Sequence, residues 1–416
     1  MDLSQSQRET ALAKIQRLVS EKYFDPNFDE AAWNRIVEDH RTAIVRAENE
    51  RAFERAVATM LSQMAPSPLA LLSDRTLIAP PNAINASFSV RAIGGEAYWV
   101  FKDVLPGGVA ARAGAKAGDV LLAIDGEPVH PSLSDGAPAA PSFEMQHEFS
   151  IDILRGDPLE EMSLVFRTAT PKYKDNPYSE PAALSVGAQT GNISYLRVSL
   201  FPGAVGIDFA NELDAIFAGR FKNADRLIID MRGNPGGGIG GLTLMSYLTP
   251  DRRAIGYSQN REMALNNIPP DALPVFDRVP RSKLALPGLA LKFLGKTSIF
   301  LYTEALGRRS WHGSTAILVD EHTAGAAEMV AQFAQENRLA TIVGMKTAGR
   351  LVTRRASKIG FGYRLVIPIA AYVSAKGNQI EGNGITPDVS IPWSFEDATV
   401  GIDRQLEGAI EALAAA

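Results

Sequence analysis

The residues with the clearest chemical potential form an apolar strand followed by a glycine-rich turn. Residues 227–237 read LIIDMRGNPGG. A strand that ends in Asp-x-Arg and passes into such a turn leaves backbone N–H groups free at the start of a helix. Donors of this kind can hold an oxyanion or a carboxylate. We therefore expect a binding turn here, with Gly236 and Gly237 among its substrate-binding residues.

A hydroxyl and an imidazole stand side by side within residues 319–331, which read VDEHTAGAAEMVA. Thr323 could act as a nucleophile only with a base within hydrogen-bond reach, and the neighbouring His322 is the nearest candidate in the sequence. Adjacent side chains in a loop that enters a helix usually point apart. Thr323 also fits the N-cap of the following helix, where its oxygen would accept a backbone N–H. We favour the cap and keep Thr323 as a candidate substitute nucleophile.

Other reactive groups are scarce. The chain has no cysteine, which excludes disulfides, zinc–thiolate sites and cysteine nucleophiles. No serine lies in a Gly-x-Ser-x-Gly elbow. His40, His130 and His147 are scattered without the spacing of metal ligands, and His312 is expected to be structural or to face a substrate. The sequence therefore predicts no metal site and no cofactor.

The elements that must position these residues alternate between strands and helices over residues 185–400. This alternation predicts βαβ units around a largely parallel sheet. Residues 270–297 are apolar, basic and rich in proline, and we expect an insertion there. A packed lid or arm is favoured over a membrane-contacting element, because the apolar run is short. Residues 401–416 are expected to form a C-terminal helix. The expected strands are Ile193–Val198, Leu227–Asp230, Ala316–Val319 and Ala340–Val343, and the expected helices are Ile207–Ala218 and Ala326–Gln335.

Two smaller regions precede this core. Residues 1–78 carry apolar side chains at helical spacing and predict a helical domain. Residues 84–170 contain short β runs separated by glycine-rich turns. Within them, Val109–Ala113 is expected to form a helical turn and Val120–Ile124 a buried strand. The overall fold class is therefore α/β, with a helical domain and a β-rich domain ahead of the core.

Composition and charge argue against some classes of function. The 416 residues carry a net charge of -5, which argues against a general nucleic-acid binder. The first residues lack the apolar core of a signal peptide, and no stretch is long and uncharged enough to span a bilayer. We expect a cytoplasmic protein with no integral membrane segment, or a periplasmic one if a leader has been removed.

The β-rich region resembles a known binding module. The run LPGGVAARAGAKAGDVLLAIDGEPV, with the tight turn at Gly118 and Asp119, resembles the signature of PDZ domains. In that family an extended peptide adds to an open sheet edge, and main-chain hydrogen bonds supply much of the affinity. The resemblance implies that residues 84–170 bind peptide ends.

Four blocks of the core resemble the C-terminal processing, or tail-specific, serine peptidase family, which shares its core with tricorn proteases. Residues 227–237 resemble "LIIDLRGNPGG", and residues 319–331 resemble "VNEgSASASEivA". Residues 342–350 (IVGMKTAGR) resemble "vvGekTfGKg", and residues 379–389 (QIEGNGITPDV) resemble "iqGkGvePDv". The resemblance implies a ClpP/crotonase-like α/β core and serine-type endopeptidase chemistry on polypeptide tails.

The positions that the resemblance marks as catalytic hold residues unsuited to that chemistry. The serine nucleophile falls on Gly325, which has no side chain. The general-base lysine of the bacterial branch falls on Arg350, and arginine stays protonated at any working pH. In the tricorn branch a Ser-His pair ends the helical domain; here Ser67 is kept, but the histidine becomes Pro68. That branch's glutamate corresponds to Glu381.

These losses favour a protein that binds unstructured polypeptide or C-terminal tails without cleaving them by the Ser/Lys or Ser/His mechanism. Gly236, Gly237 and the N–H of Ala326 would hold the bound backbone. The alternative is an active serine-type hydrolase with a non-standard nucleophile such as Thr323 or Ser67. An inactivating Ser→Gly change alone would not account for Arg350 and Pro68. A small apolar ligand is disfavoured, because the chain has one copy of the core unit, and a homo-oligomer is left open.

Overall fold

The computed structural model describes residues 3–64, 69–73, 84–131, 141, 143, 148–167, 181–189, 192–296 and 298–415. The chain divides into two compact units. The first combines residues 1–76, 252–304 and 349–384, and the second combines residues 77–251, 305–348 and 385–416. Each unit is therefore assembled from segments that are distant in the sequence.

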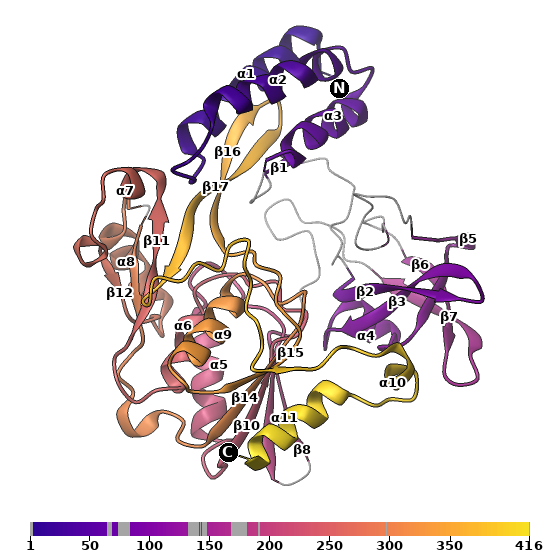
Figure 1. The fold of residues 1–416 in the computed structure, drawn as a ribbon, viewed down its shortest axis with the longest axis vertical. Coiled ribbons are helices and arrows are strands. Elements are labelled where there is room, and N and C mark those ends of the chain that lie inside the picture. Colours follow the sequence, from indigo (N-terminus) through magenta and orange to yellow (C-terminus); the bar gives the residue numbers. More distant parts are fainter. Residues whose placement is uncertain are drawn as a thin grey trace. The chain divides into compact units, whose positions relative to one another are not determined.

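The first unit packs helices against a sheet (Figure 1). The sheet order is β1-β17-β11-β13-β12, and β16 forms a long antiparallel hairpin with β17. Leu12, Trp33 and Phe53 of the first three helices pack with Tyr363 and Leu365 of β17 in one buried cluster. This cluster explains why the N-terminal helices share a unit with residues 349–384. The helices are α1 (Gln5–Lys22), α2 (Glu30–Val45), α3 (Glu50–Ser62), α7 (Arg261–Leu265) and α8 (Leu286–Lys292), with 3₁₀ turns η1 (Pro270–Ala272) and η2 (Lys283–Ala285). The strands are β1 (Ala70–Ser73), β11 (Ala254–Asn260), β12 (Val275–Phe276), β13 (Phe300–Tyr302), β16 (Val352–Gly360) and β17 (Tyr363–Ser374).

The second unit begins with a small β-rich domain. Its sheet order is β2-β3-β4-β6-β7, with β5 paired to β4, so β2 and β7 are the end strands of this order. Phenylalanines 88, 101, 149 and 166 fill its core. The elements are β2 (Ala86–Ile93), β3 (Glu96–Val104), α4 (Val109–Ala113), β4 (Val120–Ile124), β5 (Glu127–Pro128), β6 (Glu148–Arg155) and β7 (Glu160–Arg167). The predicted helical turn and buried strand are both confirmed.

The same unit contains the α/β core. Its sheet order is β18-β15-β14-β10-β9-β8; neighbouring strands run parallel except β8, which is antiparallel to β9. Helix α11 packs its Ala409 and Leu413 against Ile228 and Leu318 of the sheet. In Figure 1, α5, α6 and α9 lie on the side of the sheet opposite α11. The strands are β8 (Leu184–Gln189), β9 (Ile193–Val198), β10 (Arg226–Asp230), β14 (Ser314–Val319), β15 (Thr341–Gly344) and β18 (Val389–Ser390). The helices are α5 (Ile207–Ala218), α6 (Gly241–Tyr247), α9 (Ala326–Glu336), α10 (Phe395–Thr399) and α11 (Arg404–Ala415), with the 3₁₀ turn η3 (Gly307–Arg309).

The α/β fold class, with N-terminal helices, a β-rich region and an α/β core, is confirmed. The predicted bounds of the domains stay a prediction. Within the predicted core of residues 185–400, residues 252–304 and 349–384 belong to the first compact unit. The expected insertion, residues 270–297, lies within the segment 252–304 of the first unit. Among the described residues, no helix is both long and apolar enough to cross a membrane.

Candidate substrate-binding turn

The glycine-rich turn after β10 is fixed by one buried amide. The side chain of Asn234 is fully buried; its Nδ2 donates to Val198 O at 2.8 Å, and its Oδ1 accepts from Gly236 N at 2.8 Å. Gly236 O in turn accepts from Phe201 N, and Gly238 N donates to Phe201 O, both at 2.9 Å. These bonds hold the turn against the loop that follows β9.

A second turn meets the first at the start of α9. Ala324 N donates to Asn234 O at 2.8 Å, which ties the loop before α9 to the glycine-rich turn. The two backbones touch so closely that a Cβ added at Gly236 would lie 2.8 Å from Ala326 N and 3.0 Å from Gly325 Cα. The structure therefore brings three of the predicted site residues, Gly236, Gly325 and Ala326, into one place.

Gly325 is the N-cap of α9 and has φ 61° and ψ -127°. Residues with a Cβ rarely adopt this left-handed region. A Cβ at this position would lie 3.3 Å from both Gly236 Cα and Pro235 O, which is tighter than usual packing. Glycine therefore avoids backbone strain and a tight contact at the start of α9.

Two backbone donors in these turns, the N–H groups of Gly237 and Ala326, have no acceptor among the described residues. Ala326 is the first residue of α9, so its N–H has no partner within the helix. Free N–H groups at a helix start attract a carboxylate, an oxyanion or a peptide carbonyl. The turn can therefore bind polypeptide through backbone groups alone.

Thr323 does not cap α9, contrary to the sequence-based expectation, because Gly325 takes that position. Its fully buried hydroxyl is 2.9 Å from Met231 O and 3.0 Å from Asp320 Oδ1, and it accepts from Asp320 N at 2.9 Å. These bonds close the turn after β14 and engage the hydroxyl on both its donor and acceptor sides. This geometry gives no support to Thr323 as a nucleophile.

We expect Thr323→Val to lower the free energy of unfolding by about 1–3 kcal/mol, because the nearly isosteric valine removes the oxygen that accepts from the buried Asp320 N–H. Thr323→Ser keeps the hydroxyl and should cost less. Urea unfolding measures both effects. A fluorophosphonate probe that labelled the wild-type chain and lost that labelling in Thr323→Val would contradict the structural role.

Two further residues that the resemblance marks, Arg350 and Glu381, lie in the first unit. Gly382 N donates to Gly349 O at 2.9 Å, so the backbones beside Arg350 and Glu381 are neighbours. The side chain of Arg350 is exposed. Ser67 and Pro68 lie outside the described residues.

A buried ion-pair cluster occupies the end of β10. The fully buried Asp230 carboxylate accepts from Tyr195 Oη at 2.7 Å and from the guanidinium groups of Arg232 at 2.6 Å and Arg197 at 2.9 Å. Arg197 also pairs with Asp103 on β3 of the β-rich domain, and Arg232 pairs with Asp403 before α11 at 2.8 Å. The cluster thus connects three segments of the second unit.

The pKa values follow from these contacts. Burial alone would raise the pKa of Asp230, but the guanidinium groups of Arg197 and Arg232 hold it far below its ordinary value. Asp103 has a raised pKa, because its burial outweighs the attraction of Arg197. Asp230 therefore stays ionised within the cluster.

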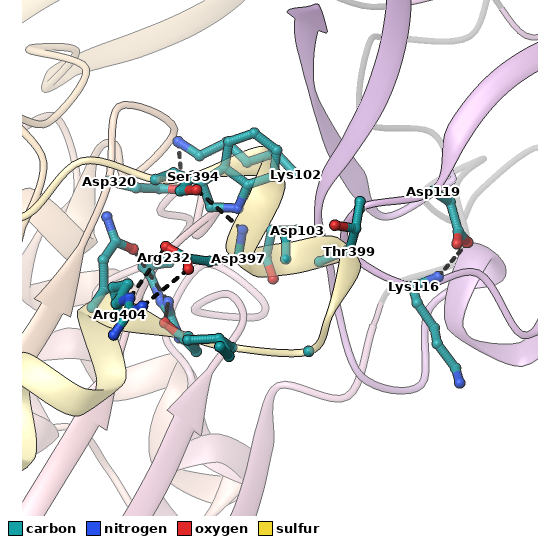
Figure 2. Close-up of a pocket in the computed structure, with 18 of the residues that line it drawn as sticks. Lys102, Asp103, Lys116, Asp119, Arg232, Asp320, Ser394, Asp397, Thr399 and Arg404 are labelled. Carbon is teal, nitrogen blue, oxygen red and sulfur yellow. Dashed lines mark hydrogen bonds and ion pairs between the residues drawn. The ribbon is translucent and has the colours of Figure 1, made fainter. Parts of the chain in front are cut away.

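A cavity of about 390 Å³ lies beside this cluster. Residues of the β-rich domain, the core and the segment before α11 line it (Figure 2). Its charges compensate one another: Arg155 pairs with Asp119 at 2.6 Å, Lys102 lies 3.8 Å from Asp320, and Arg404 pairs with Asp397 at 3.2 Å. These charged groups pair with one another where segments of the second unit meet, so their presence does not require a ligand.

Comparison with known proteins finds a matching family for the core and another for the β-rich domain. Residues 192–391 match the family described as peptidase family S41, and residues 100–137 match a PDZ domain. The core belongs to peptidase family S41. The match runs from β9 through β18 and so includes the glycine-rich turn, the start of α9 and the position of Arg350.

Relatives of this S41 core include two carboxyl-terminal-processing proteases. The protein from Picosynechococcus sp. is 24% identical over 289 residues, covering 69% of this chain and 59% of that one. The protein from Synechocystis sp. is 24% identical over 313 residues, covering 74% of this chain and 63% of that one. The chain therefore spans about three fifths of the length of these relatives. The solved structure of the photosystem II D1 C-terminal processing protease is 18% identical, with 98% of this chain and 97% of that one covered at a TM-score of 0.55, which shows a shared fold.

Sequence reasoning missed most of the ion-pair cluster around the S41 core. The Asp-x-Arg of residues 230–232 was visible, but its partners Asp103 and Asp403 are far away in the sequence. A signal was present, because Lys102 and Asp103 interrupt an otherwise apolar strand, and Arg197 interrupts another. Buried charges in apolar strands must be paired, although the sequence does not name the partner.

Proposed function

We propose that this S41-family protein binds unstructured polypeptide, above all C-terminal tails, and does not cleave it by the Ser/Lys or Ser/His mechanism. One observation carries the proposal. The resemblance aligns Gly325, which has no side chain, with the family's nucleophile, and in the described part of the chain the N–H groups of Gly237 and Ala326 have no acceptor. Binding in the turn needs only these backbone donors, whereas covalent catalysis needs a nucleophile and a base.

The PDZ domain supplies a second place for an extended peptide. Strand β2 ends the sheet order and pairs with β3 on one side. An end strand presents backbone groups to which a peptide can add as a further strand. We propose that this domain holds the chain end while the turn before α9 holds the backbone, so that two modest sites act on one flexible partner.

Ala326→Pro tests the turn by removing a single donor. Position 326 is the first residue of α9, where proline is well tolerated because no intrahelical hydrogen bond is lost. We expect peptide affinity to fall about fivefold, as for the loss of one hydrogen bond to a peptide carbonyl. Fluorescence anisotropy with a labelled peptide that ends in apolar residues and a free carboxylate measures the change.

Ala326→Gly is the matched control, since it keeps the N–H and removes only a methyl group. It should bind within about twofold of the wild-type chain. Equal affinity of Ala326→Pro and Ala326→Gly, with both variants folded, would place peptide binding elsewhere. Failure of a broad library of C-terminal peptides to bind the wild-type chain would refute the proposed function itself.

A further inference from the structure

The segment from η2 to residue 296 carries large apolar side chains that nothing in the described chain covers. Leu284 is 91% exposed, and Leu291 and Leu294 are each 75% exposed. They are the three most exposed of the large hydrophobic residues in the described ranges. Leu284 lies in η2, Leu291 in α8 and Leu294 in the turn that follows α8. We call these three residues the leucine face.

The opposite side of this segment is anchored to the first unit. The ring of Phe293 lies 5.7 Å from that of Phe276 on β12, and β12 is paired with β13 in the sheet. Leu286, Leu289 and Phe293 are partly buried. Helix α8 therefore packs on the first unit near β12 through Leu286, Leu289 and Phe293 (Figure 1). The leucine face remains exposed to solvent.

The charge around the leucine face has one sign. Between Asp277 and Glu304 the sequence contains five basic residues and no acidic one, in a chain whose net charge is -5. Arg278 and Arg281 pair with Glu304 at 3.5 and 3.2 Å. Within the described residues, no carboxylate lies at ion-pair distance from Lys292 or Lys296, and both are exposed. Apolar side chains beside unneutralised cations complement an anionic lipid surface.

We propose that the segment of residues 282–296 docks the protein on anionic bilayers, with the leucine face inserted at the headgroup boundary and Lys292 and Lys296 against lipid phosphates. The helix lies on the surface and does not span it, because α8 has only seven residues. A purely apolar protein partner would not need the cations, and an acidic soluble partner would not need three exposed leucines.

Vesicle co-sedimentation tests this proposal. The full chain is mixed with phosphatidylcholine vesicles that contain or lack about 30 mol% phosphatidylglycerol. The comparison distinguishes binding that needs anionic lipid from binding to any bilayer. We expect binding to the anionic vesicles, weakened by salt. The triple variant Leu284→Ser/Leu291→Ser/Leu294→Ser should bind at least tenfold more weakly. Each of Lys292→Gln and Lys296→Gln should weaken binding about fivefold, as expected for one cation near an anionic surface.

Val165→Ser is the matched control, because Val165 is 52% exposed on β7 of the PDZ domain. It should bind vesicles as the wild-type chain does. Equal binding to neutral and anionic vesicles, or unchanged binding of the leucine variant, overturns the proposal. Self-association that disappears in the leucine variant, without vesicle binding by the wild-type chain, also overturns it and assigns the face to a second copy. Because these surface variants leave the turn before α9 intact, peptide binding should persist in all of them, which separates this proposal from the proposed function.

Discussion

The double variant Gly325→Ser/Arg350→Lys is expected to react covalently with a fluorophosphonate, whereas the wild-type chain does not. The change places a hydroxyl at the position that the resemblance aligns with the family's nucleophile, next to Ala326 in the chain, and an amine that can lose its proton at the position that it aligns with the family's base. A general base contributes about 10²–10⁴-fold, so Gly325→Ser alone should label at least about 10²-fold more slowly. Intact-protein mass spectrometry follows the adduct with time.

Arg350→Lys alone is the control, because residue 325 then still lacks a hydroxyl. Gly325→Ser also has a cost in stability: a side chain at φ 61° should lower the free energy of unfolding by about 1–3 kcal/mol. A folded double variant that remains unlabelled would contradict the assignment of these two positions. Strong labelling of the wild-type chain would contradict the absence of a nucleophile.

Asp230→Ala should be among the most destabilising single substitutions in the chain. It removes the carboxylate that pairs with Arg197 and Arg232 and leaves their charges buried with incomplete compensation. Breaking a buried pair from one side costs about 3–5 kcal/mol. We expect a loss of this size in urea unfolding of the second unit, followed through tryptophan fluorescence of Trp99 in the PDZ domain and Trp311 in the core.

A surface ion pair provides the comparison. Glu148 and Arg167 are joined at 2.6 Å across β6 and β7, but their side chains are 59% and 79% exposed. Glu148→Ala should therefore change the free energy of unfolding by no more than about 1 kcal/mol. If Asp230→Ala were as mild as Glu148→Ala, the cluster would not hold the second unit together.

Local patterns in the sequence predicted the elements of the S41 core well. The helix Ile207–Ala218 and the strand Ile193–Val198 have the expected bounds, because glycine residues and apolar periodicity mark their ends. The family resemblance grouped Gly236 with Ala326, and the structure brings the two together.

Tertiary packing determines two features that the sequence pattern did not predict: the N-cap of α9 and the unit to which residues 349–384 belong. Thr323 fits an N-cap by residue type, yet Gly325 takes that position because the backbone there has positive φ. Residues 349–384 follow the core in sequence but pack with the N-terminal helices through Tyr363 and Leu365. Contacts of this kind depend on side chains that are hundreds of residues apart, and no local spacing announces them.

In the proposed function, the chain binds polypeptide tails and leaves them intact. The direct measurement is the anisotropy over several hours of a peptide that is labelled at its N-terminus, ends in apolar residues with a free carboxylate, and is mixed with excess wild-type protein. We predict a rise at once, followed by a constant plateau. A rise that then decays, as a labelled fragment is released, or the absence of any rise would contradict the claim.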